Sequence, residues 1–234
     1  MAASMRVIYL PGVAGFPKLS PALEGLGVDV VVPDLPGFSG APGFESPPDY
    51  LGWLTAVWDA LDRTGALPCP VIGASVGGML AADLAALRPE AVTRLALIAP
   101  LGIFDDKHPG EDLFTLTASH RLEVLFAGAV PDAFENMFEA LGTAEKRMAD
   151  YVVSIAVASL LWPLTDRGLR ARVHRIRMPS LLVWGDQDRV APVALAEHWP
   201  LGAVVTIPGG GHLVEWDEPD AVQRALHDFL FVEP

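Results

Sequence analysis

The chain has 234 residues, a formal net charge of −13, a pI near 4.7 and 51% hydrophobic residues. This length fits one domain, or one domain with an insertion, and supplies enough apolar residues for a sizeable core. The negative charge argues against nucleic acid or an anionic membrane as a partner. The single cysteine, Cys69, excludes an internal disulfide and a cysteine-rich metal site, and the apolar run after it is typical of a buried thiol.

The first hundred residues alternate short apolar segments with helical patterns. Apolar segments predict strands at 6–10, 28–32, 70–72 and 93–99. A small helix is expected around 20–26, and the proline- and glycine-rich stretch 33–48 predicts a surface loop. Asp49 can cap a helix whose apolar residues recur at helical spacing, and a further helix is expected to end at Leu87. Strands joined by helices in this way predict a doubly wound, mainly parallel sheet.

This alternation stops between residues 101 and 178. Only helical patterns occur there, at 113–126, 133–141 and 144–161, so the segment is a candidate insertion. Alternation resumes with a strand over 179–184, a helix near 193–199, a strand over 203–207 and a final helix over 219–231. We therefore expect a core formed by residues 1–100 and 179–234, with about six strands, and a helical insertion at 101–178.

The most informative stretch is Gly73-Ala-Ser75-Val-Gly77, which follows an apolar strand and begins a helix. A serine at such a turn is held in a strained conformation that exposes its hydroxyl, and flanking glycines allow strand and helix backbones to pass closely. The N–H groups of the following helix, beginning with Val76, face whatever is bound to that hydroxyl. This is the geometry that an acyl-transfer nucleophile needs, although the motif alone is only moderately specific.

Two further segments fall at the carboxyl ends of later strands, where active sites form in parallel sheets. An aspartate turn, Gly185-Asp-Gln-Asp188, follows one strand, and Pro208-Gly-Gly-Gly-His212 follows the next. The chain order Ser, Asp, His and these motifs resemble the α/β-hydrolase family over nearly the whole chain. The stretch Val32-Pro-Asp-Leu-Pro-Gly37 is also similar to a segment of that family.

The resemblance implies a catalytic triad. Ser75 matches the nucleophile, His212 the general base, and Asp188 the acid that orients the imidazole, with Asp186 as a rival after the same strand. The main-chain N–H groups of Val76 and Val13 are expected to form the oxyanion hole. The remaining histidines lie in polar loops or on helices, where surface positions are usual; they are His108, His120, His174, His198 and His227. Asp105 and Asp106, after the fourth strand, are weaker candidates for the acid.

The chain departs from the family in two places. The turn after the first strand usually reads His-Gly, whereas Pro11-Gly12 stands here, which puts the shape of the oxyanion loop in question. The chain also begins at the strand that is usually the third, so the leading hairpin is expected to be missing. An exposed sheet edge would follow, so we expect dimerisation or a shielding N-terminal segment, and the protein to be a monomer or a homodimer.

The family places its helical lid where the insertion at 101–178 occurs. Most of its apolar residues are expected to pack the lid, and a minority to line an apolar pocket over Ser75. We therefore expect a serine hydrolase that cleaves a carboxylic ester of a small to medium hydrophobic substrate through an acyl-enzyme. No metal-ligand spacing or dinucleotide-binding pattern occurs, so no cofactor or metal is expected.

Two alternatives remain open. One is hydrolysis of a carbon–carbon bond in ring-cleavage diketones with the same triad, although Ala74 stands where that branch carries asparagine. The other is a ligand-binding relative with little turnover, which only Pro11 favours. A serine nucleophile argues against haloalkane dehalogenases and epoxide hydrolases, which use aspartate. No secretory signal is convincing and the apolar run 151–162 is too short to span a membrane, so a cytoplasmic location without membrane insertion is expected.

Overall fold

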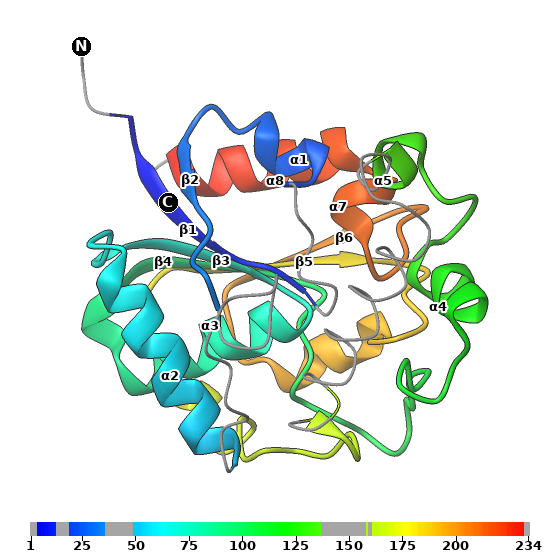
Figure 1. Ribbon diagram of the computed structural model, residues 1–234, viewed down its shortest axis with the longest axis horizontal. Coiled ribbons are helices and arrows are strands. Elements are labelled where there is room, and N and C mark those ends of the chain that lie inside the picture. Colours follow the sequence, from blue (N-terminus) through cyan, green and yellow to red (C-terminus); the bar gives the residue numbers. More distant parts are fainter. Residues whose placement is uncertain (1–3, 13–18, 36–48, 137–157, 159–160, 232–234) are drawn as a thin grey trace.

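The computed structural model describes residues 4–12, 19–35, 49–136, 158 and 161–231. In this part of the chain six parallel strands form one sheet in the order β2-β1-β3-β4-β5-β6, with helices on both faces (Figure 1). The predicted doubly wound parallel sheet is confirmed. The strands are β1 (Arg6–Leu10), β2 (Asp29–Val31), β3 (Cys69–Ala74), β4 (Val92–Ile98), β5 (Ser180–Gly185) and β6 (Ala203–Ile207).

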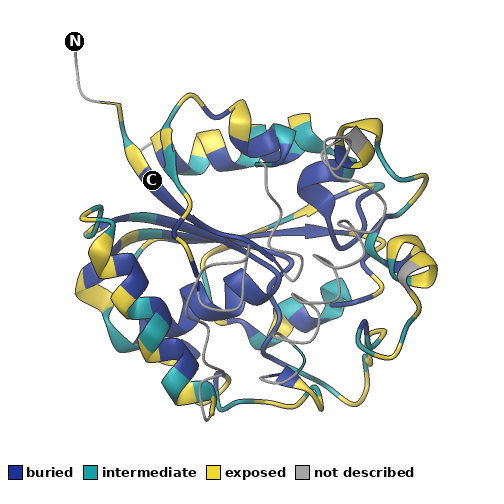
Figure 2. Cartoon of the chain, viewed as in Figure 1, coloured by how far each residue is buried: buried dark blue, intermediate teal, exposed yellow. Residues whose placement is uncertain are grey.

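The central strands are buried on both faces (Figure 2), because consecutive side chains of a strand point to opposite sides and helices cover both. On β1, Val7 and Tyr9 join one apolar cluster, and Ile8 and Leu10 join the other. The first cluster lies under α1 (Pro21–Glu24) and α8 (Pro219–Phe231), and the second under α2 (Tyr50–Arg63) and α3 (Val76–Leu87). The continuous apolar segments of the sequence are therefore explained by a sheet covered on two sides.

Local signals set several helix boundaries. Asp49 caps α2, and its Oδ1 accepts a hydrogen bond of 2.8 Å from the N–H of Gly52. The final helix has the predicted bounds, Pro219–Phe231, whereas the segment near 193–199 forms a 3₁₀ helix, Val193–His198. Two short 3₁₀ helices, Pro89–Ala91 and Val173–Arg175, and the four-residue helix α7 (Val214–Asp217) were not predicted.

The segment 101–178 is described in part. The helix expected over 113–126 is shorter, α4 (Ala118–Leu125), because Asp112 accepts a hydrogen bond from the Phe114 N–H in a turn and Thr117 caps the helix. The helix expected over 133–141 is present as α5 (Asp132–Asn136), and its expected continuation to 141 lies outside the described residues. The helix expected over 144–161 also lies almost wholly outside them, so the division into core and lid stays a prediction.

The strand order reverses between β1 and β3, because β2 lies on one side of β1 and β3 on the other. The crevice at the carboxyl ends of strands on either side of such a switch point is where ligands bind in open α/β sheets. Leu10 is in register with Gly73, so the two strands end level and the turns that follow them lie side by side. This register brings Gly12 and Ser75 together.

Candidate active site

Ser75 lies in the turn between β3 and α3. Its φ of 53° and ψ of −118° are a strained combination for a residue with a side chain. The turn is held by the Ser75 N–H, which donates to the Ile98 carbonyl (2.9 Å), and by the Leu101 N–H, which donates to the Ser75 carbonyl (3.0 Å). Ser75 is 2% exposed. Main-chain bonds on both sides of the residue therefore maintain the strain.

The glycines of the motif are needed for close approach. A Cβ on Gly77 would collide with the carbonyl oxygens of Leu10 and Pro11, and a Cβ on Gly73 would lie 2.5 Å from the carbonyl oxygen of Gly77. Strand β1, strand β3 and helix α3 thus meet backbone to backbone. Only glycine permits this contact, as the sequence motif predicts.

His212 follows β6 on the glycine-rich loop and reaches Ser75 from across the sheet. Its Nε2 is 2.8 Å from Ser75 Oγ, and its side chain is fully buried. The competing histidines lie elsewhere: His120, His174 and His227 are exposed, and His108 and His198 both contact Asp105 Oδ2. These hydrogen bonds, of which the one with His198 has the largest effect, hold the pKa of Asp105 well below its usual range. Among the described histidines, His212 alone contacts Ser75.

Asp188 lies on the other side of the imidazole. Its Oδ2 and Oδ1 are 2.9 and 3.1 Å from His212 Nδ1. Oδ1 also accepts the N–H groups of Val190 (2.9 Å) and Ala191 (2.8 Å), and Oδ2 accepts the Trp184 indole N–H (3.2 Å). The rival aspartate, Asp186, is exposed and its Oδ1 accepts the N–H of Gly209. The structure therefore brings Asp188, and not Asp186, to His212.

The structure describes one of the two residues that are predicted to form the oxyanion hole. Val76 is the first residue of α3, and N–H groups in the first turn of a helix have no partner within the helix. Val13 lies outside the described residues. Gly12 packs directly on the serine, since a Cβ at this position would lie 3.1 Å from Ser75 Cβ and 3.8 Å from Oγ. The Pro11-Gly12 turn therefore lies where the family's His-Gly turn was expected.

Two acids on α7, directly after His212 in the chain, were missed from the sequence. Asp217 Oδ2 accepts the N–H groups of Gly211 (2.7 Å) and Ala127 (3.1 Å), which ties the histidine loop to the segment after α4. Burial raises the pKa of Asp217, and the two N–H groups oppose this effect. Glu215 is 1% exposed, and burial raises its pKa to about 7. The only available signal was the acidic run Glu215-Trp-Asp217-Glu218 directly after His212.

A partly buried ion pair holds the end of the 101–178 segment on the nucleophile helix. The Asp83 carboxylate, fully buried on α3, accepts Arg172 Nε (2.6 Å) and Nη2 (3.0 Å), and it also accepts the hydroxyl of Tyr50 (2.7 Å). Two nitrogens meeting two oxygens form the strong bidentate geometry of arginine and carboxylate. This pair also had no recognised sequence signal.

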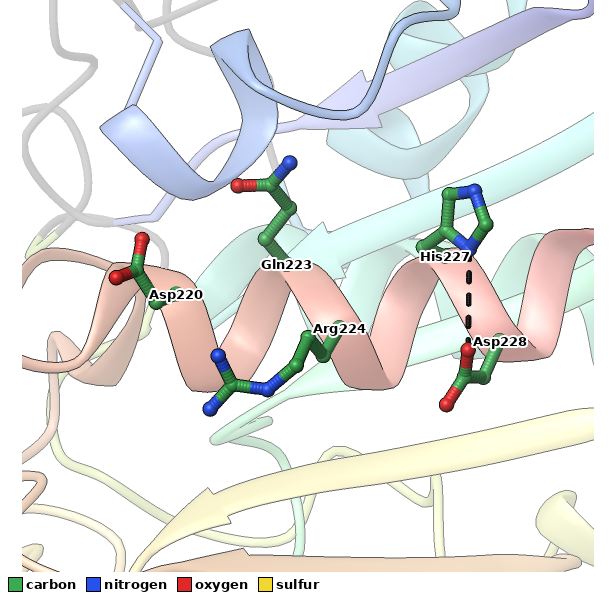
Figure 3. Close-up of a pocket in the computed structure, with 5 residues that line it drawn as sticks. All are labelled: Asp220, Gln223, Arg224, His227 and Asp228. Carbon is green, nitrogen blue, oxygen red and sulfur yellow. Dashed lines mark ion pairs between the residues drawn. The ribbon is translucent and has the colours of Figure 1, made fainter.

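The described residues contain no group of three or more metal-ligating side chains arranged to hold an ion, and no helix among them is long and apolar enough to cross a membrane. A surface pocket is lined by polar side chains of α8 alone, and none of Ser75, Asp188 or His212 is among them (Figure 3). The lining residues are Asp220, Gln223, Arg224, His227 and Asp228.

A parallel sheet with a strained serine after its third strand and a buried Ser–His–Asp chain defines a protein of the α/β-hydrolase class. The profile described as "Alpha/beta hydrolase family" matches residues 7–225. The chain therefore belongs to this family.

Relatives of known name differ in their chemistry. The chain is 29% identical over 220 residues to a dihydrolipoyllysine-residue acetyltransferase component of an acetoin cleaving system from Cupriavidus necator, covering 86% of this chain and 56% of that protein. It is 25% identical over 248 aligned positions to a 2-hydroxy-6-oxononadienedioate/2-hydroxy-6-oxononatrienedioate hydrolase from Comamonas testosteroni, covering 94% and 84%. The chain thus spans about half of the first relative and most of the second.

Solved structures show the same fold. A serine hydrolase involved in carbazole degradation superposes with a TM-score of 0.76 at 19% identity, over 99% of this chain and 92% of the other. A bacterial membrane phospholipase A gives 0.76 at 23% identity, over 97% and 78%. At these identities the likeness supports the architecture and leaves the substrate open.

Proposed function

We propose that the protein is a serine hydrolase that cleaves a carboxylic ester of a small to medium hydrophobic substrate. The observation that carries this proposal is the buried hydrogen-bond chain from Ser75 Oγ through the His212 imidazole to the Asp188 carboxylate. We assign Ser75 as nucleophile, His212 as general base and then acid, and Asp188 as the group that fixes the imidazole tautomer.

The chemistry proceeds in two halves. His212 Nε2 removes the Ser75 proton while Oγ attacks the acyl carbon, and the N–H groups of Val76 and Val13 are proposed to stabilise the oxyanion. His212 then protonates the leaving alcohol, and an acyl-enzyme forms on Ser75. Water activated by the same imidazole releases the acid and restores the serine. We further propose that residues 101–178 form a lid with an apolar face over the site.

Hydrolysis of p-nitrophenyl acetate and butyrate by the purified protein tests this proposal. Ser75→Ala is expected to abolish turnover, and Asp186→Asn, which alters an exposed turn aspartate, is expected to retain it. Full activity in Ser75→Ala would overturn the assignment. Labelling of Ser75 by a fluorophosphonate probe tests the binding-protein alternative, because an unreactive serine would favour a ligand binder.

Carbon–carbon bond hydrolysis is the second candidate, and the comparisons favour it specifically. Two relatives match 94% and 87% of this chain at 25% identity; they are named as a 2-hydroxy-6-oxononadienedioate/2-hydroxy-6-oxononatrienedioate hydrolase and a 2-hydroxy-6-oxo-6-phenylhexa-2,4-dienoate hydrolase. We propose that the same Ser75, His212 and Asp188 would serve this reaction. Measuring kcat/KM for a panel of p-nitrophenyl esters and for a 2-hydroxy-6-oxohexadienoate separates the two candidate functions, because the larger value identifies the preferred reaction. A cytoplasmic location and a monomer or homodimer remain predictions.

A further inference from the structure

Glu215 is a buried acid that the proposed reaction does not yet use. It lies on α7, three residues after His212, and it is 1% exposed. Its Oε2 has no hydrogen-bond partner among the described residues. The carboxyl group interacts with the main chain of its own residue, and burial outweighs this contact, so the ionised side chain contributes little to stability that an apolar residue would not supply better.

The groups around Glu215 come from several elements. The titratable groups whose charges act on it are His212 and Asp217 on its own segment, Asp188 after β5, and Tyr9 on β1. Burial is the largest influence on Glu215 and raises its pKa to about 7, and His212 acts in the opposite direction. Of these four neighbours, only His212 becomes a cation. The favourable electrostatic partner of an ionised Glu215 is therefore the His212 imidazolium.

Asp217, two residues later on the same helix, is an acid with a structural role. It accepts two main-chain N–H groups and so holds the histidine loop, whereas Glu215 Oε2 has no hydrogen-bond partner among the described residues and the main-chain bond of its carboxyl group is to its own residue. The two acids of one short helix thus differ in kind.

We propose that Glu215 is a second carboxylate that acts only through the His212 imidazole and, when ionised, stabilises the imidazolium that forms during turnover. This inference rests on the proposed serine hydrolase chemistry. His212 gains its proton from Ser75 in a buried site, where charges interact more strongly than in water. Glu215 is thus a positioning residue, and its protonation below neutral pH withdraws the stabilisation.

The test is the pH dependence of kcat/KM for p-nitrophenyl acetate between pH 5 and 9 in the wild type, Glu215→Gln and Asp220→Asn. Asp220→Asn removes one charge from the exposed start of α8 and controls for net charge. For Glu215→Gln we expect a loss of about tenfold above pH 8, where the charge of Glu215 is missing in the variant. We expect the loss to disappear below pH 6, and the acidic limb of the profile to move to lower pH.

A structural role predicts a different result. If Glu215→Gln lowers kcat/KM by the same factor at every pH, or leaves the profile unchanged, the inference is wrong. Glu215→Leu, of similar volume, replaces the glutamine variant if the latter does not fold, and the same pH-dependent loss is expected.

A readout without turnover separates this inference from the proposed function. The His212 ring proton is titrated by NMR in the wild type and in Glu215→Gln, and the midpoint is expected to be lower in the variant. If the wild type hydrolyses no ester but this midpoint moves, the proposed ester activity fails and the electrostatic link stands. If Ser75-dependent turnover is present and the midpoint does not move, only the link fails.

Discussion

The Trp184 indole N–H lies between two acceptors, 3.2 Å from Asp188 Oδ2 and 2.6 Å from the Ala191 carbonyl. Trp184 is the penultimate residue of β5 and is fully buried, so the indole fixes the turn that carries Asp188. Together with the N–H groups of Val190 and Ala191, it directs the carboxylate toward His212. An apolar strand residue thus orients a polar side chain at the site.

Asp188→Asn is expected to lower kcat by about 10³- to 10⁴-fold, since an amide no longer favours the imidazole tautomer with the proton on Nδ1. The matched control is Asp186→Asn, which alters the neighbouring turn aspartate and is expected to retain activity within about twofold of the wild type, as surface substitutions usually do. Steady-state kinetics with p-nitrophenyl acetate measure both. Equal losses in the two variants would contradict the assignment of the acid.

Gly77→Ala is expected to prevent folding or to lower the free energy of unfolding by more than about 2 kcal/mol, since its Cβ would collide with two main-chain carbonyl oxygens of β1 and the following turn. Gly128→Ala is the control, because a Cβ there meets no atom within 4 Å. Urea unfolding followed by circular dichroism measures the difference. A fully stable Gly77→Ala protein would show that β1 and α3 do not pack as described.

Arg172→Met is expected to lower the free energy of unfolding by about 3–5 kcal/mol, because it leaves the fully buried Asp83 carboxylate without its cation. Adding Asp83→Leu to this variant removes the orphaned charge and is expected to recover part of the loss. Urea unfolding of the two single variants and the double variant forms a mutant cycle. Additive effects would show that the two side chains do not interact.

Glu215 makes stability depend on pH in a predictable direction. Its pKa is raised from 4.5 to about 7, so the folded state binds its proton more tightly than the unfolded chain does. The resulting stabilisation is present below pH 4.5 and is lost as the pH rises through 7, by about 3 kcal/mol in total. Glu215→Gln is therefore expected to be more stable relative to the wild type at pH 8 than at pH 5. Urea unfolding at the two pH values measures this change, and an unchanged difference would contradict it.

The fold could be predicted in detail because its signals are local. The central apolar strands are buried on both faces, Asp49 marks the start of α2, and proline begins α8 at residue 219. The helix expected over 113–126 was too long, because Asp112 and Thr117 favour a turn and a cap over an early helix start. Local hydrogen bonding by short polar side chains competes with the apolar periodicity on which the prediction rested.

The sequence by itself determined the serine turn, because Gly73 and Gly77 are required wherever a strand and a helix cross at this distance. It also placed Asp188 and His212 at the carboxyl ends of strands, which lie along one edge of a parallel sheet. It favoured Asp188 over Asp186 only through the resemblance to the family's aspartate turn, since two aspartates after one strand differ in where their side chains point. The tertiary structure separated them, because the indole of Trp184 and two main-chain N–H groups hold Asp188 on the imidazole while Asp186 turns to Gly209. It also revealed Glu215 and the Asp83–Arg172 pair, whose burial depends on neighbours distant in the chain and leaves no local pattern.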